Sequence, residues 1–248
     1  DHRFDQYEYE GLPVHRFQHA FVPMGGQKNA AQMEYCNWLF AAYLRRFLAR
    51  HPQDVAHFFH LARLSGSAVT VCNQQRLPMV LTTTDFWAIC PLINLRLANG
   101  DLCAGPDAFA SNCVRHVAEV AHAAQVSRKL AFVPEAFLAA GVAAIGQRVV
   151  PERWFSPLVR ALTERPDYLR QRLNQIDRIL VPTRLMQRLL ARNGVRRSHL
   201  RFVPYGVRLD DIQRDTRKGG APNLRIGFIG TLAEHKGAHN LVRAFRRL

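Results

Sequence analysis

The chain has 248 residues, of which 48% are hydrophobic and 21% are charged. These proportions are typical of a folded protein and exclude a disordered tail, a collagen or a low-complexity polymer.

The formal net charge of +15 is unevenly distributed, because residues 1–150 carry 13 basic and 11 acidic side chains whereas residues 151–248 carry 21 basic and 8 acidic ones. Such a basic half favours a phosphate-rich partner, namely a nucleotide diphosphate, anionic lipid headgroups or nucleic acid. A solvated arginine-rich surface is the alternative explanation. No RNA-binding or zinc-finger motif accompanies the charge, so nucleic acid is an unlikely partner.

β-Rich runs and helical periodicities alternate along most of the chain. We expect strands at residues 14–17, 54–59, 78–83, 176–181 and 200–203. We expect helices at residues 29–50, 65–73, 113–129 and 184–193, with two further helices broken by Pro134 and Pro151. An irregular stretch runs from residue 85 to residue 112. Strands that alternate with helices predict a parallel, doubly wound sheet, so the expected fold class is α/β.

The composition changes near residue 206. A polar stretch with Gly219, Gly220 and Pro222 follows, and then a new strand is predicted at 224–229 and a new helix at 237–248. We therefore divide the chain into an N-terminal domain (residues 1–206), a linker (207–223) and the start of a C-terminal domain (224–248). One strand and one helix cannot bury a core, so we expect the chain to be incomplete at its C-terminal end. The first residue is Asp1 rather than a methionine, so we expect the start to be incomplete as well.

The loop between that predicted strand and helix has the residue types of a phosphate site. Its sequence over residues 230–237 is GTLAEHKG. Gly230 lets backbone N–H groups approach an anion, the following helix adds its partial positive charge, and Lys236 adds a full one. A tight turn with a solvated Lys236 is the alternative.

Six short motifs, taken in chain order, resemble the GT-B glycosyltransferases of family 4. They are DVAHFFH at 54–60, TDFWAICP at 84–91, DRILVPT at 177–183, FVPYGV at 202–207, IGFIGTL at 226–232 and KGAHNLVRAF at 236–245. The resemblance implies a GT-B fold, with a Rossmann-like acceptor domain at 1–206 and the first βα unit of a nucleotide-sugar-binding donor domain at 224–248.

The resemblance also implies an activity. The chain would be part of a retaining hexosyltransferase that moves a sugar from a nucleotide-diphosphate sugar to a hydroxyl of a glycan or lipid-linked acceptor, in polysaccharide or glycolipid biosynthesis and with no cofactor or catalytic metal. Gly230, Thr231, Lys236 and Gly237 would bind the donor, with Lys236 at the diphosphate. Thr231 stands where many members carry an arginine.

On the acceptor side, the resemblance assigns Thr84 and Asp85 to the cleft, with Asp85 as the catalytic candidate. Thr84 stands where many members have a histidine. Asp85 has a second explanation as a turn former. His57, at a strand end beside the predicted cleft, is either a cleft residue or a buried core histidine. The family's glycine-rich first loop and paired glutamates are not among these 248 residues, so we expect no turnover from the chain as given.

Three cysteines and a histidine of the irregular stretch and its following helix have zinc-site chemistry. Cys90, Cys103, Cys113 and His116 would give a closed tetrahedral structural site, and Cys113-x-x-His116 has the spacing of a metal knuckle. Three reduced thiols and a solvated His116 are the alternative. The odd number of five cysteines and the lack of a visible signal peptide predict a cytoplasmic protein.

An aromatic and apolar stripe runs along the predicted helix at 29–50. It consists of Met33, Trp38, Phe40, Tyr43 and Phe47. A helical core face is its ordinary explanation, and a peripheral contact with the inner face of the membrane is the other. The alternative to a transferase is a non-catalytic basic module that binds nucleic acid or an anionic membrane.

Overall fold

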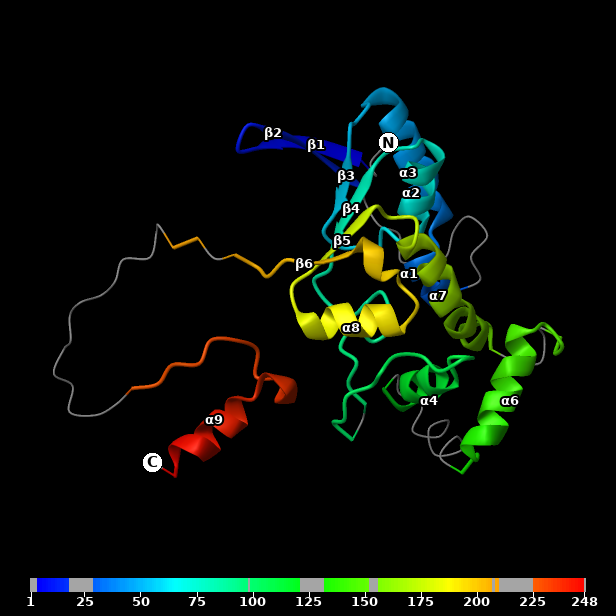
Figure 1. Cartoon of the computed structure of the whole chain (residues 1–248), viewed down its shortest axis with the longest axis vertical. Helices are drawn as coiled ribbons and strands as arrows, with labels where there is room; N and C mark the ends of the chain where they lie inside the picture. The colour runs from blue at the N-terminus through cyan, green and yellow to red at the C-terminus, as the bar shows by residue number, and fades with distance from the viewer. Residues whose placement is uncertain are drawn as a thin grey trace. The chain divides into compact units, whose positions relative to one another are not determined.

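A computed structural model describes residues 4–17, 29–97, 99–120, 132–151, 156–206, 208–209 and 225–247. The chain divides into two compact units, Asp1–Tyr205 and Gly206–Leu248 (Figure 1). In the described part, no helix combines the length and the apolar character that crossing a bilayer requires.

The first unit opens with an antiparallel hairpin. It is built from β1 (Phe4–Tyr9) and β2 (Leu12–Phe17). The connecting residues Glu10 and Gly11 have φ angles of 50° and 77°, and two consecutive positive φ angles are what a type I′ turn requires. The predicted strand at 14–17 is therefore the second strand of a hairpin, and β1 was not predicted.

The helix predicted at 29–50 is two helices, α1 (Ala30–Tyr35) and α2 (Trp38–Arg50). Asn37 causes the break. Its Oδ1 accepts the N–H of Phe40 at 3.0 Å, and its own N–H donates to the hydroxyls of Ser65 and Ser67, both at 3.0 Å. Because these hydrogen bonds cap the start of α2, the first helix ends before Asn37 and the second begins directly after it.

The aromatic stripe of α1 and α2 is mostly core. Met33 and Phe40 are buried. The hairpin covers Tyr43 and Phe47, because the Phe17 ring stacks 4.9 Å from that of Tyr43 and His15 lies 4.9 Å from Phe47. Only Trp38 of the five is exposed. The core interpretation of this stripe is confirmed.

A four-stranded parallel sheet forms the centre of the first unit (Figure 1). Its strands are β3 (Ala56–Phe58), β4 (Met79–Thr82), β5 (Arg178–Val181) and β6 (Leu200–Phe202). The connections contain α3 (Ser67–Gln74), α4 (Ser111–Val120), α6 (Glu135–Gly146), α7 (Pro157–Leu173), α8 (Arg184–Arg192) and the 3-10 turn η2 (Arg197–His199). The predicted parallel α/β sheet is confirmed. The predicted helix at 113–129 begins at Ser111, and residues 121–129 of it lie outside the described residues.

The strand order in the sheet is β3-β4-β5-β6, so each step along the chain moves in one direction. A doubly wound sheet needs a reversal of that direction, and the four described strands contain none. Right-handed connections that advance in one direction place their helices on one face. Accordingly, alternate side chains such as Leu81, Ile179 and Val181 are buried, whereas Val80 and Leu180, which point to the other face, are half-exposed.

A second, smaller apolar cluster joins α4, α6 and α7. It contains Val114, Val117, Val142 and Leu162. The Asp107 carboxylate lies before α4 and accepts hydrogen bonds from the backbone N–H groups of Phe109, Ser111 and Asn112. Burial opposes ionisation of Asp107, but the Ser111 hydroxyl and these amides outweigh it and hold the pKa of Asp107 below its ordinary value.

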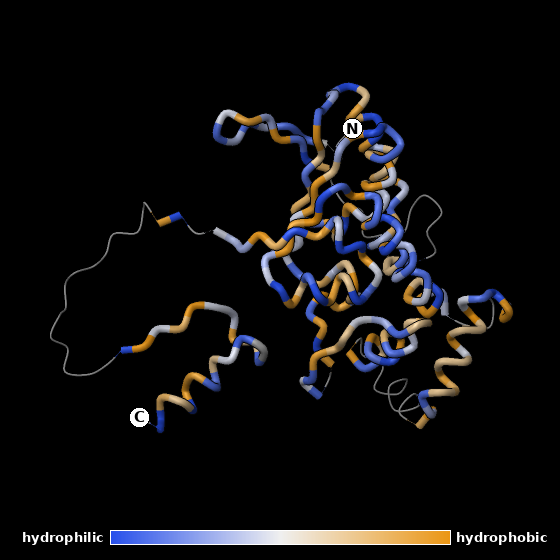
Figure 2. The backbone as a smooth tube through the Cα atoms, viewed as in Figure 1, coloured by the Kyte–Doolittle hydropathy of each residue, from blue (hydrophilic) through white to orange (hydrophobic). Residues whose placement is uncertain are grey.

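The second unit contains the 3-10 turn η3 (Glu234–Lys236) and α9 (Ala238–Phe245). The strand predicted at 224–229 is not formed over its described residues, 225–229. A strand needs a partner for its backbone groups, and this segment has none among the described residues. No described residue of this unit is buried, and apolar side chains such as Ile229 and Leu232 are exposed. Figure 2 shows hydrophobic segments, in orange, before α9.

Candidate functional site

A small hollow lies at the carboxyl ends of β3 and β4, the edge at which open parallel sheets bind their ligands. Its lining includes Phe59 and His60, which follow β3, and Thr83, Thr84 and Asp85, which follow β4. The interior volume is about 20 Å³, which is enough for one water molecule. A larger ligand would therefore lie across the mouth of the hollow, with only a small group inside.

The two ionisable side chains of this hollow form a pair. His60 Nε2 lies 2.7 Å from Asp85 Oδ2. The other ring nitrogen of His60, Nδ1, accepts the backbone N–H of Ala62 at 2.9 Å, so the ring proton is on Nε2 and is donated to the carboxylate. Asp85 Oδ1 accepts the N–H of Trp87 at 2.8 Å. Both oxygens of Asp85 are thus oriented, and each keeps a lone pair for a further donor.

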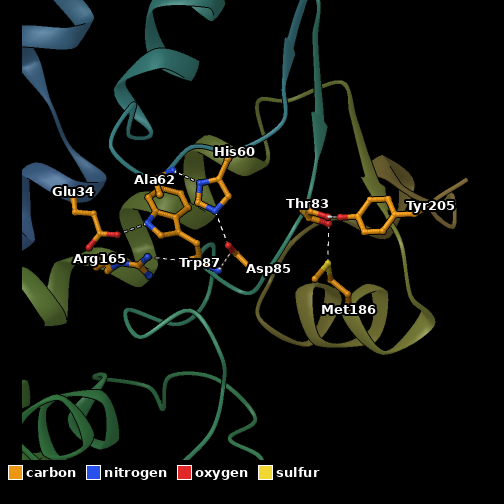
Figure 3. A network of polar contacts seen from close by, with 9 residues as sticks. All are labelled: Glu34, His60, Ala62, Thr83, Asp85, Trp87, Arg165, Met186 and Tyr205. Atoms are coloured by element: carbon orange, nitrogen blue, oxygen red, sulfur yellow. Dashed lines mark hydrogen bonds and ion pairs between the residues drawn. The ribbon is translucent and has the colours of Figure 1, made fainter. Parts of the chain in front are cut away.

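A buried network supports Trp87 and, through it, the loop that carries Asp85 (Figure 3). The Trp87 indole N–H donates to Glu34 Oε1 at 2.6 Å. The Arg165 guanidinium donates to the carbonyl of Trp87 and lies 5.1 Å from the centre of its ring. Arg165 is only 3% exposed, and its Nε has no partner in the described part of the chain. Burial lowers the pKa of Arg165, and the nearby Glu34 carboxylate opposes that effect.

Thr83, two residues before Asp85, connects the end of β4 with Tyr205 and with Met186 of α8 (Figure 3). Its carbonyl accepts the hydroxyl of Tyr205 at 2.8 Å, and its N–H donates to the carbonyl of Leu180. Its Oγ1 lies 2.8 Å from Met186 Sδ in α8. Because Thr84 and Asp85 follow directly, these bonds hold the loop after β4 against the sheet.

Of the predicted acceptor-side residues, Thr84 and Asp85 line this hollow and His57 does not. His57 is exposed rather than buried, and its Nε2 lies 2.8 Å from Thr82 Oγ1. Its ring stacks on Phe59 at 4.4 Å. His57 belongs to β3 itself, where side chains alternate between faces, whereas His60 follows the strand and can turn towards the edge.

The three cysteines of the predicted metal set lie near one another. Burial raises the pKa of the Cys113 thiol to about 12, and the nearby Cys103 and Cys90 thiols add to that effect. Cys103 is half-buried, and its sulfur contacts the backbone of Gly105.

His116 is buried on α4 but lines a separate hollow with Arg115, Glu119 and Glu135. Within the described ranges, no three histidine, cysteine or acidic side chains form a group able to hold a metal ion. The structural zinc site at Cys90, Cys103, Cys113 and His116 stays a prediction.

The predicted donor residues belong to the second unit. Gly230 and Thr231 precede η3, and Lys236 is its last residue. Gly237 joins η3 to α9 with a φ angle of 75°. This left-handed conformation favours glycine, because glycine has no Cβ that would clash with the backbone. The Lys236 side chain is exposed, directly before the helix. The first N–H groups of α9 have no acceptor within the helix, as at every helix start.

Sequence reasoning placed His60, like His57, either beside the predicted cleft or in the core, but it paired Asp85 with neither His60 nor Trp87. His60 lies two residues after β3, and Asp85 lies three residues after β4. Because neighbouring parallel strands end at the same edge of a sheet, this spacing could have predicted that the two side chains meet. Arg165 is four residues from the buried Ala161 and Leu169 on α7, and a cation inside an apolar helix stripe indicates a buried polar contact.

Comparisons with protein-family models, with curated proteins and with solved structures gave no significant match.

Proposed function

We propose that the chain takes part in the transfer of a sugar from a nucleotide-diphosphate sugar to an acceptor hydroxyl, with retention of configuration at the sugar. The observation that carries the proposal is the Asp85–His60 pair at the carboxyl edge of the parallel sheet. An oriented carboxylate at a ligand-binding edge suits a substrate rich in hydroxyl groups. The motif resemblance to family 4 GT-B enzymes supports the same activity.

On the acceptor side, the hydroxyl attacks the sugar on the same face from which the diphosphate leaves, which retains the configuration, and Asp85 accepts the hydrogen bond of this hydroxyl. The His60 imidazole and the Trp87 N–H hold the carboxylate in one orientation. An oriented carboxylate that accepts the hydroxyl proton raises the nucleophilicity of the oxygen, which contributes typically about 10²–10⁴ in rate. The exposed Thr84 hydroxyl beside it adds a second polar contact for the acceptor.

On the donor side, Lys236 stabilises the negative charge that develops on the leaving diphosphate. The free N–H groups at the start of α9 act in the same direction, because the helix dipole is positive at that end. Gly237 keeps the backbone free of a Cβ at this approach, and Gly230 and Thr231 complete the loop.

Isothermal titration with uridine and guanosine diphosphates tests the donor side. We expect one of the two to bind saturably, and Lys236→Ala to weaken that binding by about tenfold. Arg246→Ala is the matched control, since it removes one exposed cation at the opposite end of α9. Equal weakening by both variants would assign the effect to net charge and remove Lys236 from the site.

Since we expect no turnover from these 248 residues, the acceptor side is tested in a chain extended to include a complete donor domain. Release of nucleoside diphosphate from a panel of nucleotide sugars with glycan and lipid-linked acceptors is the measurement. We expect Asp85→Asn to bind diphosphate normally and to lose at least about 100-fold in transfer. Full activity of Asp85→Asn excludes the proposed role of this carboxylate.

The arginine excess supports a second candidate, a non-catalytic module that binds a polyanion. Salt separates the two, because binding to a phosphate backbone falls steeply with ionic strength whereas nucleotide-sugar binding is selective for base and sugar. Tight, salt-sensitive binding to DNA without any response to nucleotide diphosphates would contradict the transferase proposal.

A further inference from the structure

Residues 178–202, which contain β5, α8, η2 and β6, include seven arginines and no acidic residue. Arg184, Arg188 and Arg192 are spaced four residues apart on α8 and therefore share one side of the helix. All three are exposed, as is Arg197 in η2. We call Arg184, Arg188, Arg192 and Arg197 the arginine surface.

The charges of the arginine surface are not neutralised within the described residues, since no carboxylate pairs with any of the four. Arginines of the preceding helix α7 behave differently. Arg160 pairs with Glu164 at 2.8 Å, and Arg170 pairs with Asp167 at 2.8 Å. The excess positive potential is thus concentrated where α8 and η2 meet the solvent.

A hollow with a volume of about 170 Å³ lies within this surface. Its lining consists of Gln187, Arg188, Ala191, Arg197 and Leu200. Arg188 and Arg197 both line this hollow. Arginine binds phosphate through paired N–H donors, so the hollow is the part of the surface best suited to a single phosphate group.

Exposed apolar side chains accompany the arginines. Leu185 of α8 and Phe202 of β6 are each 39% exposed. Arg184 lies over one face of the Phe202 ring at 4.6 Å, so that face is not free to stack on a nucleic-acid base. Basic residues mixed with a partly exposed leucine and a partly exposed aromatic ring suit the boundary between lipid headgroups and acyl chains.

We propose that the arginine surface docks the chain on an anionic phospholipid bilayer. One headgroup phosphate occupies the hollow between Arg188 and Arg197, and Leu185 meets the acyl boundary. This inference rests on the first unit alone and is independent of the proposed transfer reaction. It also moves the predicted membrane contact from the stripe of α2, which the hairpin and core cover, to α8.

Co-sedimentation of the full chain with vesicles tests the proposal. We use phosphatidylcholine vesicles with and without roughly a third of phosphatidylglycerol, and expect binding only to the anionic ones. Arg188→Gln/Arg197→Gln is expected to weaken this binding by about 25-fold, since each basic residue at an anionic leaflet contributes roughly fivefold. Leu185→Ser is expected to lower the fraction that stays bound at high salt.

The matched control is Arg46→Gln/Arg50→Gln, which removes two exposed charges from α2. It is expected to change vesicle binding by less than about twofold. Equal losses in the two double variants would overturn the proposal, because binding would then follow net charge. Binding to vesicles without anionic lipid at equal strength would also overturn it. So would a protein that ignores all vesicles but binds a DNA duplex through Arg188 and Arg197.

Discussion

The carboxyl edge of the sheet and the arginine surface belong to the same unit but differ in how their charges are partnered. Asp85 is held by His60 and Trp87, and Trp87 in turn by Glu34 and the buried Arg165. The arginine surface has no such partners among the described residues and faces solvent. Paired buried groups fix positions, whereas unpaired exposed charges attract a distant partner. Substitutions at the first region should therefore change stability, and at the second only binding.

The largest effect is expected at Arg165. Arg165→Ala leaves the carbonyl of Trp87 without its donor and opens a cavity beside the ring, so the free energy of unfolding should fall by about 3 kcal/mol. Urea denaturation measures the change. Arg170→Ala, on the same helix but at an exposed side chain that pairs with the exposed Asp167, should lose less than about 0.5 kcal/mol. Similar losses in both would mean that burial of Arg165 contributes nothing to the network.

Asp107 supplies an intermediate case, a carboxylate held by backbone amides. Its pKa is lowered in the folded protein, so it stabilises the fold above the unfolded pKa, and this contribution is lost as the pH falls through the folded pKa. Asp107→Asn should cost about 1 kcal/mol at pH 7 and less than that at about pH 2. Urea denaturation at the two pH values measures this difference. A cost that is the same at both would show that the charge is irrelevant to capping α4.

Asp85→Asn should have a smaller effect on stability, about 1 kcal/mol or less, because the pair with His60 is a third exposed. The amide can still accept the Trp87 N–H, so the loop keeps its turn. Thermal unfolding measured beside the transfer assay sharpens the comparison. A stability loss as large as that of Arg165→Ala would make Asp85 a structural residue of the network and weaken its proposed role at the acceptor.

The smallest effect is expected at the arginine surface. Arg188→Gln/Arg197→Gln should change the free energy of unfolding by less than about 0.5 kcal/mol, since both side chains are exposed and neither has a described carboxylate partner. Circular dichroism melting curves of the double variant and the parent chain measure this. A large loss would indicate that these arginines hold α8 to η2 rather than facing a ligand.

Local patterns predicted most of the central sheet. β4, β5 and α8 lie within two residues of their expected bounds, because a short β-branched run or an apolar periodicity is read from neighbouring residues alone. The incorrect predictions concern elements whose boundaries depend on residues far away in the sequence. The break at Asn37 depends on two serines about 30 residues further along the chain, and residues 225–229 form no strand because no described strand pairs with them.

The sequence by itself determined the parallel α/β sheet, the position of Asp85 after a strand, the glycine and lysine before α9 and the excess of arginine in the second half. Tertiary structure decided that His60 rather than His57 meets Asp85, that Arg165 is buried against Trp87, and which arginines remain unpaired. The physical reason is range. Periodicity and turn chemistry act between neighbours, whereas these contacts join residues 25 and 78 positions apart and form only when the strands and helices pack.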